Sequence, residues 1–275
     1  MAVPAYCKFV LDAPLSAFVK CFWYWEGAPQ GHTKERLMPN GEPTIVFNLR
    51  DDPIRIYEAD DLARSSSYGR AVVSGPRTGS FVIDSVQEER VFGIQFLPGG
   101  SYPFFRTPTS ELENRSFALT DLWPRRAEEF REQLLEASSV TEMLAVAEKL
   151  LLSQVVKPME LHRAVAFARR EFCRSPHRVS IGSVLGQVGL SQRRFIELFT
   201  EQVGLAPKIF CRVRRFQRTL ETVHCRSDVD WVEVALSCGY YDQAHFIHDF
   251  KEFSGLTPSQ YQARATEHLN HVPIP

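Results

Sequence analysis

An internal repeat at a spacing of 51 residues constrains this chain of 275 residues more than any other feature. Residues 191–199 (SQRRFIELF) align with residues 242–250 (DQAHFIHDF). The match continues through the pairs Gly204/Gly255, Leu205/Leu256, Pro207/Pro258 and Phe210/Tyr261. A repeat of this kind indicates a duplicated supersecondary unit. The second half of the chain is therefore expected to contain two copies of one helical unit.

Each copy carries the signals that begin and end a helix. An N-cap residue, Ser191 or Asp242, can accept hydrogen bonds from the backbone amides of the first turn. Two phenylalanines four residues apart then place one face of the helix in a core. The repeated glycine suits the left-handed position after a helix, and the repeated proline suits the first turn of the next helix. The phenylalanine pairs are Phe195 with Phe199 and Phe246 with Phe250.

A shorter helix and a glycine turn precede each capped helix. Residues 179–188 lead to Gly189, and residues 231–237 lead to Gly239. A short helix, a tight turn and a second helix form the helix-turn-helix arrangement. The alternative is a pair of helical hairpins that only pack against each other.

The segment that joins the two units, residues 207–224, is predicted to be one helix of about 27 Å at ~1.5 Å per residue. Its apolar stripe consists of Phe210, Val213, Phe216, Leu220 and Val223. Its positive charges are Lys208, Arg212, Arg214, Arg215 and Arg218. A rod of this length can hold two recognition helices about one DNA turn (~34 Å) apart, so that both enter the major groove on one face.

The stretch from Trp231 to Lys251 (WVEVALSCGYYDQAHFIHDFK), followed by residues 255–261 (GLTPSQY), resembles the signature of the AraC/XylS family of bacterial transcription regulators. The resemblance covers about residues 160–264. It implies an all-α domain with two helix-turn-helix units that binds promoter DNA in the cytoplasm, typically as an activator that works with RNA polymerase. The first unit departs from the family pattern at Gly182 and Gly186, and each glycine costs a helix about 1 kcal/mol relative to alanine.

The same resemblance assigns the residues that read bases. They are Arg193, Ile196 and Glu197 in the first unit, flanked by Gln192, and Gln243, Ala244, Ile247 and His248 in the second. Arg can pair with guanine, Gln with adenine and Glu with cytosine, while Ala and Ile can contact a thymine methyl. Contacts to phosphates are expected from Arg194, Lys208 and Arg212. The alternative for each residue is an ordinary solvated surface, with Glu197 paired to Arg193 or Arg194.

The charge distribution agrees with one DNA-binding half. Residues 158–265 carry 15 Lys and Arg against 11 Asp and Glu, whereas residues 1–157 carry 17 against 21. A basic half joined to an acidic half indicates that one domain binds a polyanion and the other does not. His245 and His248 could form a metal pair, but no third ligand lies near them in the sequence, so we expect no metal.

The first part of the chain has the pattern of β-strands. Short β-branched or aromatic runs at residues 22–25, 44–49, 54–57, 81–83 and 90–96 are separated by Gly, Pro and Asn turns. They predict an antiparallel β-barrel or sandwich. The stretches 37–41 (LMPNG) and 96–100 (FLPGG) resemble a cupin-like module that is often fused to this DNA-binding domain, over about residues 10–125. Because His32 is the only histidine before His162, a multi-histidine metal centre is excluded, and no cofactor is expected.

Helical spacing from Ala127 to Gln154, broken at residues 137–139, predicts two flanking helices that serve as a dimer surface or a strut. The expected domains are residues 1–155, a sensor or dimerisation domain, and 158–265, the DNA-binding domain, followed by a tail at 266–275. The chain as a whole is expected to be α+β.

Seven aromatic residues of the first half could line a ligand pocket or fill the core: Trp23, Trp25, Phe92, Phe96, Tyr102, Phe104 and Phe105.

These observations predict a transcription regulator with double-stranded promoter DNA as its partner, and with a small-molecule effector, RNA polymerase and a second copy of the chain as further candidates. No apolar run approaches the ~18 residues that cross a bilayer, and the first residues lack the order of a secretory signal, so we expect a cytoplasmic protein. No residue pattern points to catalysis. The alternative is a ligand-binding or enzymatic β-barrel protein whose helical half is only an interaction module.

Overall fold

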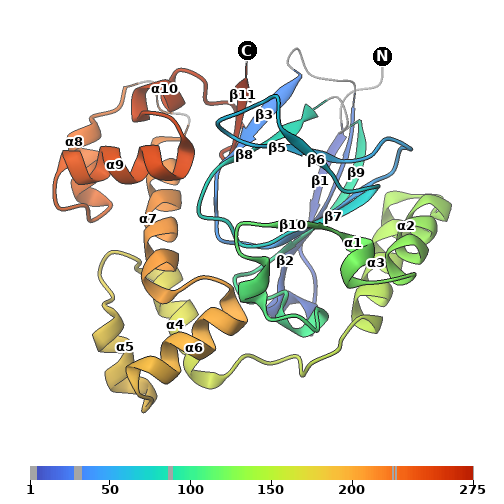
Figure 1. Cartoon of the computed structure of the whole chain (residues 1–275), viewed down its shortest axis with the longest axis horizontal. Coiled ribbons are helices and arrows are strands. Elements are labelled where there is room, and N and C mark those ends of the chain that lie inside the picture. The colour runs from blue at the N-terminus through green and yellow to red at the C-terminus, as the bar shows by residue number, and fades with distance from the viewer. Residues whose placement is uncertain (1–4, 28–32, 86–88, 225, 227, 275) are drawn as a thin grey trace.

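The computed structural model describes residues 5–27, 33–85, 89–224, 226 and 228–274. Two antiparallel sheets fill one side of the molecule, and the helices of the second half lie on the other side (Figure 1). Within the described residues, no helix has both the length and the apolar character that a bilayer crossing needs.

The two sheets lie face to face as a sandwich and do not close into one barrel. In one sheet the order is β1 (Ala5–Phe9), β2 (Val19–Glu26), β9 (Arg90–Phe96), β4 (Thr44–Asn48), β7 (Ala71–Ser74) and β10 (Ser116–Ala118). In the other it is β11 (His271–Ile274), β3 (Lys34–Leu37), β8 (Phe81–Asp84), β5 (Arg55–Tyr57) and β6 (Ser65–Ser67). The predicted antiparallel architecture is confirmed in its sandwich form. Each of the five predicted runs overlaps a strand, and the runs 44–49 and 54–57 each extend one residue beyond it.

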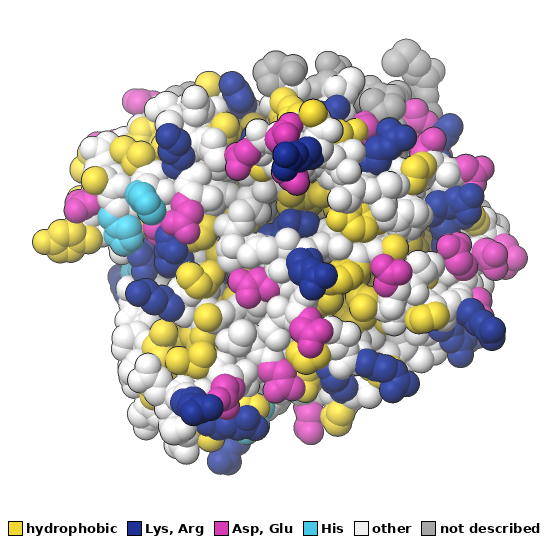
Figure 2. Space-filling view, viewed as in Figure 1, with side chains coloured by type: hydrophobic (Ala, Val, Ile, Leu, Met, Phe, Trp, Pro, Cys, Tyr) yellow, Lys and Arg dark blue, Asp and Glu magenta, His cyan; other side chains and the backbone are white. Residues whose placement is uncertain are grey.

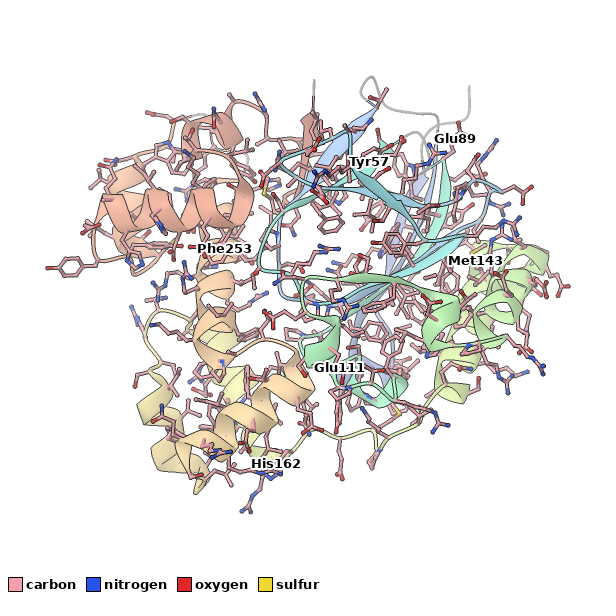
Figure 3. The ribbon with its side chains drawn as sticks, in the orientation of Figure 1. Tyr57, Glu89, Glu111, Met143, His162 and Phe253 are labelled. Atoms are coloured by element: carbon pink, nitrogen blue, oxygen red, sulfur yellow. The ribbon has the colours of Figure 1, made fainter. Side chains whose placement is uncertain are left out.

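A pair of helices covers one face of the first sheet. After the short α1 (Leu119–Leu122) come α2 (Arg126–Glu136) and α3 (Val140–Ser153), which are separated at the predicted break. Phe130 of α2 stacks on Phe47 of β4 with ring centroids 4.8 Å apart. Met143 of α3, labelled in Figure 3, is buried in the same core. The two helices therefore complete the core of the β-rich half.

The second half is helical throughout up to the tail, as the sequence predicts. It contains α4 (Arg163–Arg174), α5 (Ile181–Val188), α6 (Gln192–Val203), α7 (Pro207–Val223), α8 (Trp231–Ser237), α9 (Gln243–Ser254) and α10 (Pro258–Gln262). The first short helix begins two residues later than expected, because Ser180 accepts a hydrogen bond from the Ser183 amide and caps it. The joining helix α7 ends at Val223, with His224 as its C-cap.

The tail differs from the expectation. Residues 271–274 form β11, which pairs antiparallel with β3 at the edge of the second sheet. Val272 of this strand is 1% exposed. The chain therefore returns to the β-rich half after it has formed the helical domain (Figure 1).

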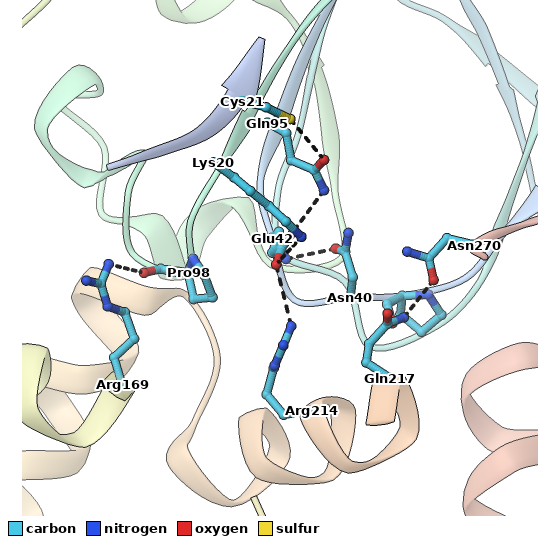
Figure 4. A network of polar contacts seen from close by, with 11 residues as sticks. Lys20, Cys21, Asn40, Glu42, Gln95, Pro98, Arg169, Arg214, Gln217 and Asn270 are labelled. Carbon is cyan, nitrogen blue, oxygen red and sulfur yellow. Dashed lines mark hydrogen bonds and ion pairs between the residues drawn. The ribbon is translucent and has the colours of Figure 1, made fainter. Parts of the chain in front are cut away.

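Polar contacts join the two halves (Figure 4). Glu42, whose side chain is 3% exposed, lies 2.8 Å from Lys20 Nζ and 3.5 Å from Arg214 Nη1 of α7. Gln217 of α7 donates hydrogen bonds to the Pro39 carbonyl and to Asn270 Oδ1, each at 2.9 Å. The joining helix is thus held against the β-rich half near its middle, through Arg214 and Gln217.

Replacing Gly186 by alanine is expected to stabilise the protein. Gly186 is an exposed residue inside α5, and a Cβ there meets no atom within 4 Å. The substitution removes the helix penalty of glycine, so the free energy of unfolding in urea should rise by up to about 1 kcal/mol.

Gly239→Ala is the contrasting variant. Gly239 has φ +77°, and a Cβ there collides with His177. Because left-handed backbone costs an L-residue roughly 1–2 kcal/mol, this variant should lose stability. If both variants shift the urea midpoint in the same direction, the assignment of the two glycines is wrong.

Candidate nucleic-acid interface

Helix α6 exposes the face that the sequence predicts to read DNA. The Ser191 side chain accepts a hydrogen bond from the Arg194 amide, which fixes the first turn. Phe195 and Phe199 are fully buried. On the opposite side Gln192, Arg193, Arg194 and Glu197 are exposed, and Ile196 is half-buried. The helix therefore presents a polar outer face while it is anchored by its phenylalanines.

The charged residues of that face are paired with one another. Arg193 Nε lies 2.9 Å from Glu197 Oε1, and Arg194 Nη1 lies 3.6 Å from Glu197 Oε2. The hydrogen bond from Arg193 lowers the pKa of Glu197. The Arg193 side chain is 91% exposed. Exposed pairs of this kind contribute little to stability, so the Arg193 guanidinium can exchange its partner for a base.

Helix α9 repeats the arrangement in the second unit. The Asp242 side chain accepts a hydrogen bond from the His245 amide, and Phe246 and Phe250 are fully buried. The predicted base-reading residues Gln243, Ala244, Ile247 and His248 are all exposed. Sequence reasoning missed Tyr241, which is 89% exposed in the turn before α9. The available signal was an aromatic residue directly before Asp242, the N-cap of α9.

Arg212, which is predicted from the sequence to contact a phosphate, is paired with two carboxylates. Its Nη2 atom lies 2.7 Å from Asp249 Oδ1 and 2.6 Å from Glu252 Oε2, both on α9. These hydrogen bonds raise the pKa of Arg212. Arg212 therefore fixes the second unit on α7, and its charge is compensated within the protein. Its partners lie 37 and 40 residues away, so no local pattern could identify them.

One group of side chains has the composition of a metal site. Ligand atoms of His248, Asp249 and Glu252 lie within 4.8 Å of one another. The two carboxylates, however, are the partners of Arg212. The guanidinium supplies the positive charge that a metal would supply, so the group is explained as an ion-pair cluster.

A groove of about 640 Å³ separates the two units. It is lined by residues 176–181, by Lys208, Cys211, Arg212 and Arg215 of α7, and by His245, His248 and Asp249 of α9. Arg178 and Arg215 add positive charge that the sequence analysis did not assign to DNA contacts. Figure 2 shows histidine side chains next to Lys and Arg side chains where the second unit meets α7. A groove lined by several cationic side chains suits a phosphate backbone.

Comparison with known proteins agrees with this geometry. Residues 185–264 match a family model described as a helix-turn-helix domain, and residues 11–118 match one described as a domain of unknown function, DUF6597. An uncharacterised helix-turn-helix-type transcriptional regulator of Haemophilus influenzae is 33% identical over 73 residues, which are 26% of this chain and 24% of the relative. The arabinose operon regulatory protein of Escherichia coli is 29% identical over 143 residues, 49% of each chain.

A solved structure covers more of the chain at lower identity. ToxT of Vibrio cholerae with an unsaturated fatty acid bound has a TM-score of 0.45 and 10% identity, and the alignment covers 90% of this chain and 96% of ToxT. The chain spans about a quarter to a half of the length of the two relatives described above. The second half of the chain therefore contains a helix-turn-helix domain. The resemblance to AraC/XylS regulators is confirmed for this domain.

Proposed function

We propose that the protein is a sequence-specific DNA-binding transcription regulator whose β-rich half responds to a small molecule. The observation that carries the proposal is the pair of capped helices, α6 and α9, whose outer faces are exposed while their inner faces are anchored on α7. The relatives that carry the name of transcription regulators support it. We retain the domain division at 155–158 and add the tail strand to the β-rich domain.

The length of α7 supports simultaneous binding of both units. Its 17 residues give a helix of about 26 Å at ~1.5 Å per residue. Recognition helices that emerge from opposite ends of such a rod can occupy successive major grooves, which are ~34 Å apart.

We assign base contacts and phosphate contacts to different residues. Arg193 is suited to guanine, Glu197 to cytosine and Gln243 to adenine, while Ala244 and Ile247 offer apolar contacts to thymine. Phosphate contacts are assigned to Arg194 and Lys208, with Arg178 and Arg215 of the groove added to them. Ile196 and His248 are also assigned to the base contacts, which Gln192 flanks. Arg212 is kept as a phosphate contact, and it also holds α9 in place.

Binding to duplex DNA across a salt series tests the proposal. If Lys and Arg side chains displace counterions from phosphates, the logarithm of the affinity should fall linearly and steeply with the logarithm of the salt concentration. Negligible binding at low salt would favour the other class of protein, a ligand-binding or enzymatic β protein whose helical half is an interaction module.

Replacing Arg193 by alanine should relax the preference for one base pair. We expect affinity for the selected site to fall by roughly 1–3 kcal/mol, with little change for non-specific DNA. Selection of binding sites from a random duplex pool by the variant and by the wild type measures this directly. Arg170→Ala is the matched control, because Arg170 is an exposed arginine of α4 outside the recognition helices. Identical selected sequences for Arg193→Ala and wild type would refute the role of Arg193.

A further inference from the structure

A cavity of about 520 Å³ lies between the two sheets of the β-rich half. Cavities that bind small molecules typically measure ~300–1,000 Å³. One wall comes from the first sheet, with Trp23 and Trp25 of β2 and Val46 of β4. The opposite wall comes from the second sheet, with Ile56 of β5 and Phe81 of β8.

The indole of Trp23 forms a flat part of this wall. Trp23 faces Gly93 across the β2–β9 pair, and a Cβ at Gly93 would collide with the indole ring. Glycine at this position therefore lets the ring lie against the sheet. Of the aromatic residues singled out from the sequence, the two tryptophans line the cavity, whereas the four phenylalanines, Phe92, Phe96, Phe104 and Phe105, are buried in the core. Tyr102 instead donates a hydrogen bond to Glu201 of α6 at 3.1 Å.

The C-terminal tail supplies a third wall. Residues 267–271 line the cavity, directly before β11 joins the edge of the second sheet. The Tyr261 hydroxyl donates a hydrogen bond to the Leu269 carbonyl at 2.9 Å, and Gln217 donates one to Asn270 Oδ1 at 2.9 Å. The wall is therefore attached to α10 and to α7 of the DNA-binding domain. Figure 4 shows the contact of Asn270 with Gln217 of α7.

The acidic groups around the cavity have partners. Glu42 is paired with Lys20 and Arg214, and Glu35 Oε2 lies 2.7 Å from His271 Nδ1. Asp84 accepts a hydrogen bond from the Tyr57 hydroxyl at 3.3 Å. None of these three carboxylates is paired with Arg77, a half-buried cation that also lines the cavity.

Within the described residues, the groups that bind Arg77 are neutral. Its Nη2 atom donates to Ser116 Oγ at 2.6 Å and its Nη1 atom to the Asn114 carbonyl at 3.4 Å, while the guanidinium lies 4.2 Å from the ring centre of Phe81. Its Nε atom is buried without a hydrogen-bond partner in the described part of the chain. Burial lowers the pKa of Arg77 to about 10, so the group is still charged at neutral pH. A half-buried cation that has no anionic partner among the described residues is costly, because part of its hydration is lost without compensation.

We propose that this cavity binds a small organic carboxylate with an aromatic body. The carboxylate pairs with the Arg77 guanidinium, which is suited to planar two-point recognition of this group. The aromatic body lies against Trp23 and Phe81, and the tail closes the remaining side. The proposal names the ligand class of the β-rich half, and only its consequence for DNA binding rests on the proposed function.

Three aromatic carboxylates and their neutral amides test the ligand class: benzoate, 3-phenylpropanoate and 2-naphthoate with the corresponding amides. Binding to the full chain is measured by calorimetry and by quenching of tryptophan fluorescence, without DNA. At least one carboxylate should bind ten or more times more tightly than its amide. If no carboxylate binds more tightly than its amide, the proposal is overturned.

Arg77→Gln tests the role assigned to the guanidinium. The variant should lose ten-fold or more of the affinity for the carboxylate and leave binding of the amide unchanged. Arg115→Gln is the matched control, because Arg115 also lies over an aromatic ring, that of Phe117, but does not line the cavity. If Arg77→Gln is poorly folded by circular dichroism, Arg77→Lys keeps the charge without the planar fork and should show a smaller loss. Wild-type affinity in the folded variant overturns the proposal.

The two proposals fail separately in this design. A chain that binds a carboxylate through Arg77 but shows no salt-dependent binding to duplex DNA supports the cavity and refutes the regulator. A chain that binds DNA but does not distinguish carboxylate from amide supports the regulator and refutes the cavity proposal.

Discussion

Glu42→Gln is expected to lower the free energy of unfolding by about 3 kcal/mol, as measured in urea. Removing one partner of a buried ion pair leaves uncompensated charge and typically costs ~3–5 kcal/mol. The lower end applies because the Lys20 side chain is 40% exposed, whereas that of Arg214 is 18% exposed. Gln95, which donates to Glu42 Oε2 at 2.7 Å, can keep its hydrogen bond to the amide oxygen. The loss of stability therefore measures what the negative charge of Glu42 contributes.

Glu89→Gln is the matched control. Its partner Arg50 lies 2.9 Å away, but the Arg50 side chain is 54% exposed and the Glu89 side chain is 30% exposed. A pair in this setting contributes about 0–1 kcal/mol. Equal losses in the two variants would contradict the account of Glu42 as the buried ion-pair centre between α7 and the sheet.

The double variant Lys208→Ala/Arg215→Ala is expected to weaken DNA binding on the order of 50-fold at 0.1 M salt, for specific and non-specific duplexes alike. Each phosphate contact contributes about 0.9 to the slope of log affinity against log salt, so the slope should fall by about 2. Both residues line the groove between the two units, and neither lies on a recognition helix. Fluorescence anisotropy at several salt concentrations gives the affinity and the slope together.

Arg126→Ala/Lys149→Ala removes the same charge from α2 and α3 and is the control for net charge. Both of these residues are exposed and distant in sequence from the helix-turn-helix domain. If Lys208→Ala/Arg215→Ala loses affinity for one DNA sequence only, then Lys208 or Arg215 reads bases. An equal loss of DNA affinity in the control variant would mean that the effect comes from the overall charge of the protein.

The signals that the sequence predicted correctly are local ones. Ser191 and Asp242 cap their helices, and Gly204 and Gly255 end them with φ of 92° and 71°. Each of these preferences is decided within a few residues, so a repeat in the sequence becomes a repeat in the structure. The strands with strong β-branched or aromatic runs were predicted for the same reason.

The features that escaped prediction depend on distant partners. β11 is stabilised by residues 34–37, more than 230 positions earlier, and nothing within residues 266–275 announces that pairing. Arg212 has the composition of a phosphate contact, and only the packing of α9 on α7 brings Asp249 and Glu252 to it. Arg77 lies at the cavity between the two sheets, and a single sequence does not specify which residues line that cavity.

The spacing of base contacts on a selected duplex tests the central claim most directly. Methylation protection of major-groove guanines by the full chain should give two clusters on one face of the DNA, with centres about 10 base pairs apart, one from α6 and one from α9. Arg193→Ala should weaken the first cluster and Gln243→Ala the second. A single cluster, or two clusters on opposite faces of the duplex, would contradict the account.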